Sequence, residues 1–140
     1  MFYLLALRFF CKFISNFANA QICRAIRIFM SSISALRAHL IPGQSVVITT
    51  HFNPDSDAIG SSLAWQKYLI KKGLQVDVVI PSALSRNLTW MSGADAVLDF
   101  ENILHKPTVE SKIHAADWIL IQLRKIGQNL CLTLLSFRLI

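Results

Sequence analysis

A chain of 140 residues is long enough for one domain with a substantial core and too short for two. Hydrophobic residues make up 54% of it and charged residues 16%, a balance that excludes intrinsic disorder. The net charge of +6 is typical of a nucleic-acid-binding protein, but the two ends of the chain carry it. All acidic residues lie between Asp55 and Asp117, and residues 41–118 are close to neutral. The basicity is therefore a weak guide to the partner of the central part.

Residues 1–29 are apolar but interrupted by basic side chains, and their longest uncharged run is residues 13–23. A spanning helix needs about 20 mostly uncharged residues, so we expect no transmembrane span. We interpret residues 1–29 as an apolar, basic extension outside the domain, which then starts near Met30. Two alternatives stay open: a secretion signal cleaved after Ala20, and a basic amphipathic helix lying on a membrane surface.

The three cysteines, Cys11, Cys23 and Cys131, have no metal-binding or redox-motif spacing. An odd number also argues against a complete set of disulfides. We interpret them as reduced thiols and expect a cytoplasmic protein.

The central part alternates helical and strand patterns. An additional N-terminal helix, capped by Ser31 or Ser32, is expected to run to Leu40, where Pro42-Gly43 marks a turn. Apolar, β-branched runs predict strands, and apolar residues at helical spacing, closed by Lys71-Lys72-Gly73 in the first case, predict helices. In chain order we expect a strand at 45–50, a helix at 57–72, a strand at 76–80, a short helix at 85–91, a strand at 96–100, a helix at 109–116 and a strand at 118–123.

This alternation predicts an α/β fold, specifically a Rossmann-like, doubly wound parallel sheet with the extra N-terminal helical segment. The domain is expected to span residues 30–123. Residues 124–140 are apolar, contain no acidic residue and do not fit a further strand–helix unit. We therefore treat them as an aberrant tail.

One imidazole and two carboxylates follow the first predicted strand within seven residues: His51, Asp55 and Asp57. Ligands bind beyond the carboxyl ends of strands in open α/β sheets, and this mixture of ligands suits Mn²⁺, Zn²⁺ or Fe²⁺ better than Ca²⁺. Pro54 is expected to fix the turn, and Asn53 to tie its side chain to the backbone. The competing interpretation is a helix N-cap, with both acids serving the first turn and no metal at all.

The string His-Phe-Asn-Pro-Asp-Ser-Asp-Ala-Ile-Gly-Ser-Ser over residues 51–62, directly after Val-Val-Ile-Thr-Thr, resembles the first motif of the DHH (or DDH) phosphoesterases. That family includes RecJ-like exonucleases and oligoribonuclease/phosphoadenosine-phosphate phosphatases. The likeness runs from about Ser32 to Ile119 and is closest to the second branch. It implies a site for two Mn²⁺ ions, one held by His51 and Asp55 and the other by Asp57, with a hydroxide between them attacking a phosphate ester. Short oligonucleotides or nucleotides would be the substrates.

Two features depart from the family. Ser56 replaces a usual glycine, which would cost about 1 kcal/mol if that position requires a positive φ. The family also has a bridging aspartate just beyond the strand predicted at 118–123, where this chain continues with Arg124 and Lys125, and the Asp-His-His motif and substrate-binding domain are missing. A frameshift near residues 119–122 accounts for both the missing acid and the tail. We therefore expect a truncated metal-dependent phosphoesterase with weak or no activity.

We also predict roles for Gly60, the tryptophans and Arg86. Gly60 is expected to let the helix approach the strand closely, with free amides at its start facing a phosphate. The tryptophans are assigned to the core rather than to base stacking, while Arg86 is a candidate phosphate contact. The alternative functions are a non-catalytic nucleotide- or phosphate-binding module, and a membrane-surface protein anchored by residues 1–29.

Overall fold

The computed structural model describes residues 26–29, 37–123 and 131–136. Within these residues the strands form one sheet in the order β1-β6-β5-β2-β3-β4. Four neighbouring strands are parallel: β5 (Trp118–Leu123), β2 (Ser45–Thr49), β3 (Gln75–Ile80) and β4 (Leu98–Asp99). At the other side of β5, β6 (Cys131–Ser136) and then β1 (Ile26–Phe29) continue the sheet in antiparallel fashion.

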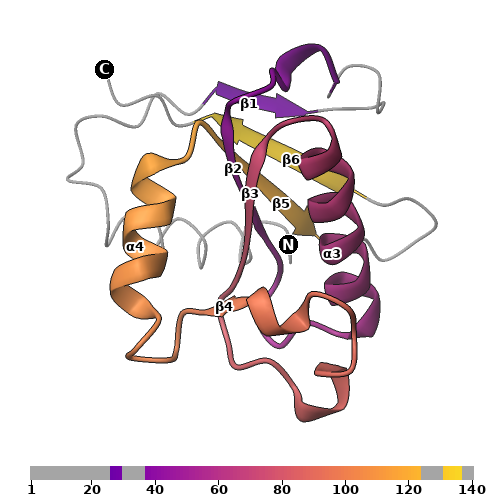
Figure 1. The fold of residues 1–140 in the computed structure, drawn as a ribbon, viewed down its shortest axis with the longest axis vertical. Helices are drawn as coiled ribbons and strands as arrows, with labels where there is room; N and C mark the ends of the chain where they lie inside the picture. The colour runs from indigo at the N-terminus through magenta and orange to yellow at the C-terminus, as the bar shows by residue number, and fades with distance from the viewer. Residues whose placement is uncertain (1–25, 30–36, 124–130, 137–140) are drawn as a thin grey trace, which may run out of the picture.

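Two helices cover opposite faces of this sheet, α3 (Ser56–Lys71) and α4 (Lys106–Ala115), with the strands between them (Figure 1). The core is accordingly divided in two. The α3 side buries Val46, Ile48, Ile59, Leu63, Leu69, Leu74, Val76, Val78, Ile80, Leu88, Val97 and Leu120, and the α4 side buries Val47, Val79, Val109, Ala116, Ile119 and Ile121. The predicted α/β class is confirmed.

The central strand β2 explains why the apolar run at its position is continuous. Successive side chains of a strand point to opposite faces, and both faces here are covered. Val46 and Ile48 pack on the α3 side, whereas Val47 packs on the α4 side. Both neighbours of β2 are strands as well, so its backbone is paired along both edges.

Helix α3 begins and ends where its terminal residues predict. The side chain of Asp55 caps the first turn, and Lys71 lies in the last turn, where a cation stabilises the helix dipole. Beyond it, Gly73 adopts a φ of +86°, the amide of Gly73 donates to Ile70 O, and that of Leu74 donates to Leu69 O. This is the Schellman arrangement that the sequence Lys-Lys-Gly favours.

Several elements differ from the sequence prediction. The short helix predicted at 85–91 is the 3-10 turn η1 (Arg86–Leu88), and a second turn, η2 (Ala94–Ala96), shortens the predicted strand at 96–100 to two residues. Helix α4 starts three residues earlier than predicted because Pro107, with its fixed φ, suits the first turn.

The two ends of the chain differ as well. Ile26–Phe29, in the segment interpreted as an extension outside the domain, is a strand of the sheet. Cys131–Ser136, in the segment treated as an aberrant tail, pairs along its whole length with β5. Ser31, Ser32, Arg124 and Lys125 lie outside the described residues, where the structure tests nothing. In the described ranges no helix combines the length and hydropathy needed to cross a membrane.

Candidate functional site at the carboxyl end of β2

The loop with the predicted ligands leaves β2 at the point where the order of strands reverses. Thr49, the last residue of β2, lies beside Val79 of β3 and Ile121 of β5. From β2 the chain passes through α3 to β3 on one side and returns through α4 to β5 on the other. Crevices beyond the carboxyl ends of strands at such a reversal are the usual ligand sites of open α/β sheets.

His51 lies two residues beyond Thr49, the end of this strand. Its Nδ1 lies 3.0 Å from the carbonyl oxygen of Phe52, while its Nε2 is buried with no hydrogen-bond partner. Because a carbonyl only accepts, Nδ1 is the donor in this contact, and in the tautomer with a single ring proton Nε2 presents a lone pair. Histidines that bind a metal through one ring nitrogen usually donate the N–H of the other ring nitrogen to a carbonyl, a carboxylate or water.

The turn after His51 is shaped by Asn53 and Pro54. Asn53 has a φ of +50°, the single positive φ of a non-glycine among the described residues. Its backbone amide donates to the Oγ of buried Ser82 at 2.9 Å. Asparagine tolerates this left-handed conformation better than most residues. Asn53 therefore shapes the loop through its backbone, and not through the side-chain bond that the sequence suggested. Pro54 is buried, in keeping with a structural role.

Asp55 and Asp57 lie at the start of α3. Oδ1 of Asp55 accepts from the amide of Ala58 at 2.9 Å, so Asp55 is the N-cap, while Asp57 is exposed in the first turn. Across the described residues, no three His, Cys, Asp or Glu side chains come together in a group that could hold a metal ion. The residues fit a metal in kind, but the structure does not assemble the expected three-ligand group.

The structure shows no positive φ at Ser56 and no close contact at Gly60. Ser56 is the first residue of α3 and does not have a positive φ, so replacing the family's glycine causes no backbone strain there. At Gly60, an added Cβ would meet nothing within 4 Å. Close approach of α3 to the sheet therefore does not depend on Gly60. The small residues of α3 that contact the sheet are Ser61 and Ser62, of which Ser62 is fully buried.

The neighbouring strand contributes a residue that the sequence analysis missed. Gln122, 3% exposed, follows Ile121 in β5, and its Oε1 lies 3.1 Å from Ser61 Oγ and 2.7 Å from Ser62 Oγ. Its Nε2 is buried without a partner. The available signal was a glutamine in an otherwise apolar strand, since buried polar groups require partners.

The hydrogen-bond donors around Gln122 indicate that its side-chain amide has the opposite orientation, with Nε2 and Oε1 exchanged. Ser62 Oγ lies 2.8 Å from Ala58 O and Ser61 Oγ 2.6 Å from Asp57 O, so each hydroxyl already has a carbonyl acceptor for its one proton. Turning the amide by 180° lets Nε2 donate to both hydroxyls and satisfies every proton. The atom left without a partner is then the Gln122 oxygen. His51 in the loop after β2 and Gln122 in β5 thus each present a buried acceptor, Nε2 and this oxygen.

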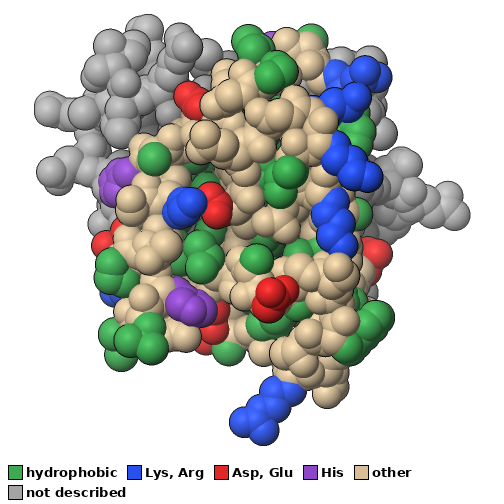
Figure 2. Space-filling view, viewed as in Figure 1, with side chains coloured by type: hydrophobic (Ala, Val, Ile, Leu, Met, Phe, Trp, Pro, Cys, Tyr) green, Lys and Arg blue, Asp and Glu red, His purple; other side chains and the backbone are tan. Residues whose placement is uncertain are grey.

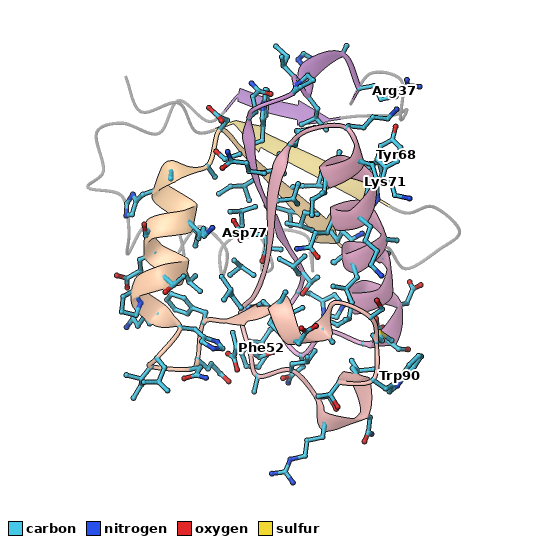
Figure 3. The ribbon with its side chains drawn as sticks, viewed as in Figure 1. Arg37, Phe52, Tyr68, Lys71, Asp77 and Trp90 are labelled. Carbon is cyan, nitrogen blue, oxygen red and sulfur yellow. The ribbon has the colours of Figure 1, made fainter. Side chains whose placement is uncertain are left out.

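Aromatic residues are distributed differently from the prediction. Trp65 and Trp118 pack against the core as expected, but Trp90 is 78% exposed, so its assignment to the core is wrong. Phe52 is 57% exposed beside His51. Both rings lie toward the end of the molecule where β2 and β3 finish (Figure 3). Arg86, the candidate phosphate contact, is exposed in η1.

Comparison with known proteins adds nothing to this geometry: no family model, curated protein or solved structure matches the chain.

Proposed function

We propose that the chain is a partial, Rossmann-like domain of a metal-dependent phosphoesterase of the DHH type. The observation that carries the proposal is His51: a tautomer fixed by Phe52 O, with Nε2 buried, unpartnered and placed beyond the central strand. A buried lone pair without a donor is costly unless a cation or water occupies it. The parallel order β4-β3-β2-β5 is also that of the first four strands of doubly wound sheets, which supports the Rossmann-like class.

The proposed ligands are His51, Asp55 and Asp57, and the proposed ion is Mn²⁺. A divalent ion there would supply an activated water and offset the charge of a phosphate ester. The described residues do not gather a full ligand set. We therefore propose weak metal binding and little or no hydrolysis of short oligonucleotides or nucleotides by this chain.

Mn²⁺ titration followed by electron paramagnetic resonance of the free ion tests the proposal directly. Binding should weaken at least tenfold in His51→Ala and in Asp57→Asn. His114→Ala, an exposed histidine in α4, is the matched control and should bind as the unaltered chain does. Equal binding by His51→Ala and the control would refute the metal site. Robust turnover of a dinucleotide that His51→Ala abolishes would refute the predicted inactivity instead.

One observation favours the non-catalytic alternative, a phosphate-binding module. Asp55 already serves as the N-cap of α3, which needs no metal. However, two carboxylates at the start of α3, the N-cap Asp55 and Asp57 in the first turn, oppose an anion at the same amides, so nucleotide binding at this loop should require a divalent ion. Calorimetry with a mononucleotide in the presence of a chelator distinguishes the metal site from the phosphate-binding module. Metal-free binding that is lost when the first turn of α3 is altered would favour the module.

A further inference from the structure

The large aromatic ring of Trp90 is exposed to solvent on a hydrogen-bonded turn. Tryptophan side chains are mostly buried, so 78% exposure is an informative departure. The turn around it is bonded on both sides, with Met91 N donating to Leu88 O and Ala94 N to Met91 O. Lys67 Nζ of α3 lies 3.0 Å from Ser92 Oγ and ties this turn to the helix. The backbone thus presents the ring to solvent at a defined place.

A line of cations leads from this ring along α3. Residues three and four apart share a helix face, so Ala64, Lys67 and Lys71 form one stripe, and all three are exposed. Lys and Arg side chains stand in a row along the edge of the molecule that α3 forms (Figure 2). Arg37 and Lys71 lie together at the far end of this row from Trp90 (Figure 3). We call Arg37, Lys67, Lys71 and Lys72 the basic edge.

We propose that Trp90 and the basic edge bind a short single-stranded oligonucleotide, with phosphates along the lysines and one base stacked on the indole ring. Lys67 and Lys71 are separated by about 6 Å along the helix axis, comparable with neighbouring phosphates of a stretched strand. Proteins bind unpaired nucleotides by combining cations along the phosphates with exposed aromatic rings, because every base has a face that stacks. This proposal rests on the proposed function and specifies its substrate class.

The charge and apolar patterns favour a nucleic acid over a membrane. The one acidic residue of α3, Asp57, lies ten residues before Lys67, so no acid separates Lys67 from Lys71 on their stripe. The acid nearest to Trp90 in sequence is Asp95 in η2. The most exposed aliphatic residues, Ile103 and Leu104, lie in the turn before α4 and not beside the basic edge. Helix α3 itself exposes one large aliphatic side chain, Ile70, which is 52% exposed. A membrane-binding face would gather several such side chains beside the cations.

The test is fluorescence anisotropy of a dye-labelled thymidine pentanucleotide, titrated with the full chain in chelator at several salt concentrations. Trp90→Leu should weaken binding about tenfold. Lys67→Gln with Lys71→Gln should reduce the slope of log affinity against log salt by about 1.4, the value for two phosphate contacts with a single strand. Circular dichroism checks that each variant is folded.

The matched control is Lys106→Gln with Lys112→Gln, which removes the same charge from α4, on the opposite face. Its salt slope should stay close to that of the unaltered chain. Equal slopes for both double variants, or unchanged affinity in Trp90→Leu, would overturn the proposal, as would binding of anionic phospholipid vesicles through these residues without binding of the oligonucleotide. His51→Ala should leave this metal-free binding intact, so failure here and failure of the metal site are distinguishable.

Discussion

The hydroxyl of Ser62 in α3 lies 2.7 Å from the side-chain amide of Gln122 in β5, and both residues are buried. This contact joins the helix that follows the candidate ligand loop to the strand on the far side of the reversal in strand order. It also leaves one end of the Gln122 amide without a partner.

The effect of replacing Gln122 on stability should therefore depend on whether the new side chain is charged. Gln122→Met removes the unpartnered amide and leaves each serine bonded to its helix carbonyl, so the free energy of unfolding should change by less than about 1 kcal/mol. Gln122→Glu places a charge at the same buried position and should cost about 3 kcal/mol or more. Urea denaturation measures both, and a methionine variant as unstable as the glutamate variant would contradict the orientation assigned to the amide.

Asp55 has a structural role that can be separated from its proposed metal role. Its carboxylate accepts from the Ala58 amide, a bond that asparagine can also make. Asp55→Ala should lower the free energy of unfolding by about 1 kcal/mol, whereas Asp55→Asn should leave it nearly unchanged. Thermal denaturation checks the difference. If Asp55→Asn nevertheless loses Mn²⁺ affinity, the metal role stands apart from the cap.

Gly60 and Gly93 should respond in opposite directions to an added methyl group. A Cβ at Gly60 meets open space within a helix, so Gly60→Ala should stabilise the protein by about 0.5–1 kcal/mol. Gly93 has a φ of +97°, and Gly93→Ala should destabilise by about 1–2 kcal/mol. Paired urea titrations provide the comparison. A destabilising Gly60→Ala would restore the close-approach role first suggested for that glycine.

The left-handed conformation of Asn53 predicts a substitution series. Asn53→Gly should leave stability within about 0.5 kcal/mol, because glycine adopts a φ of +50° freely. Asn53→Val should cost about 1–2 kcal/mol, since a β-branched side chain is disfavoured there. Ser82→Ala removes the hydroxyl that accepts from the Asn53 amide and serves as a control for the loop contact. Equal stability of the glycine and valine variants would mean that the loop does not require this conformation.

The central elements could be predicted because their signals are local. A β-branched run such as residues 46–49 has few alternatives to a buried strand, and Asp55 with Gly73 marks both ends of α3. The pairing of Ile26–Phe29 with Cys131–Ser136 could not be predicted, because it joins residues about one hundred or more positions apart in the chain.

The candidate site was predictable in position but not in detail. The loop after the first predicted strand does lie at the reversal of strand order, because topology alone places it there. Whether His51, Asp55 and Asp57 converge depends on side-chain directions, which spacing does not give. Trp90 was misassigned because hydrophobicity predicts burial only on average, and its turn points outward.

The antiparallel pairing of Cys131–Ser136 with Trp118–Leu123 bears on solubility. Without it, β5 would become an edge strand with apolar side chains and a row of unpaired backbone amides and carbonyls. Such an edge can pair with a strand from another molecule. A shortened form ending at Leu123 should therefore self-associate, even though it would retain the loop, both covering helices and all four parallel strands.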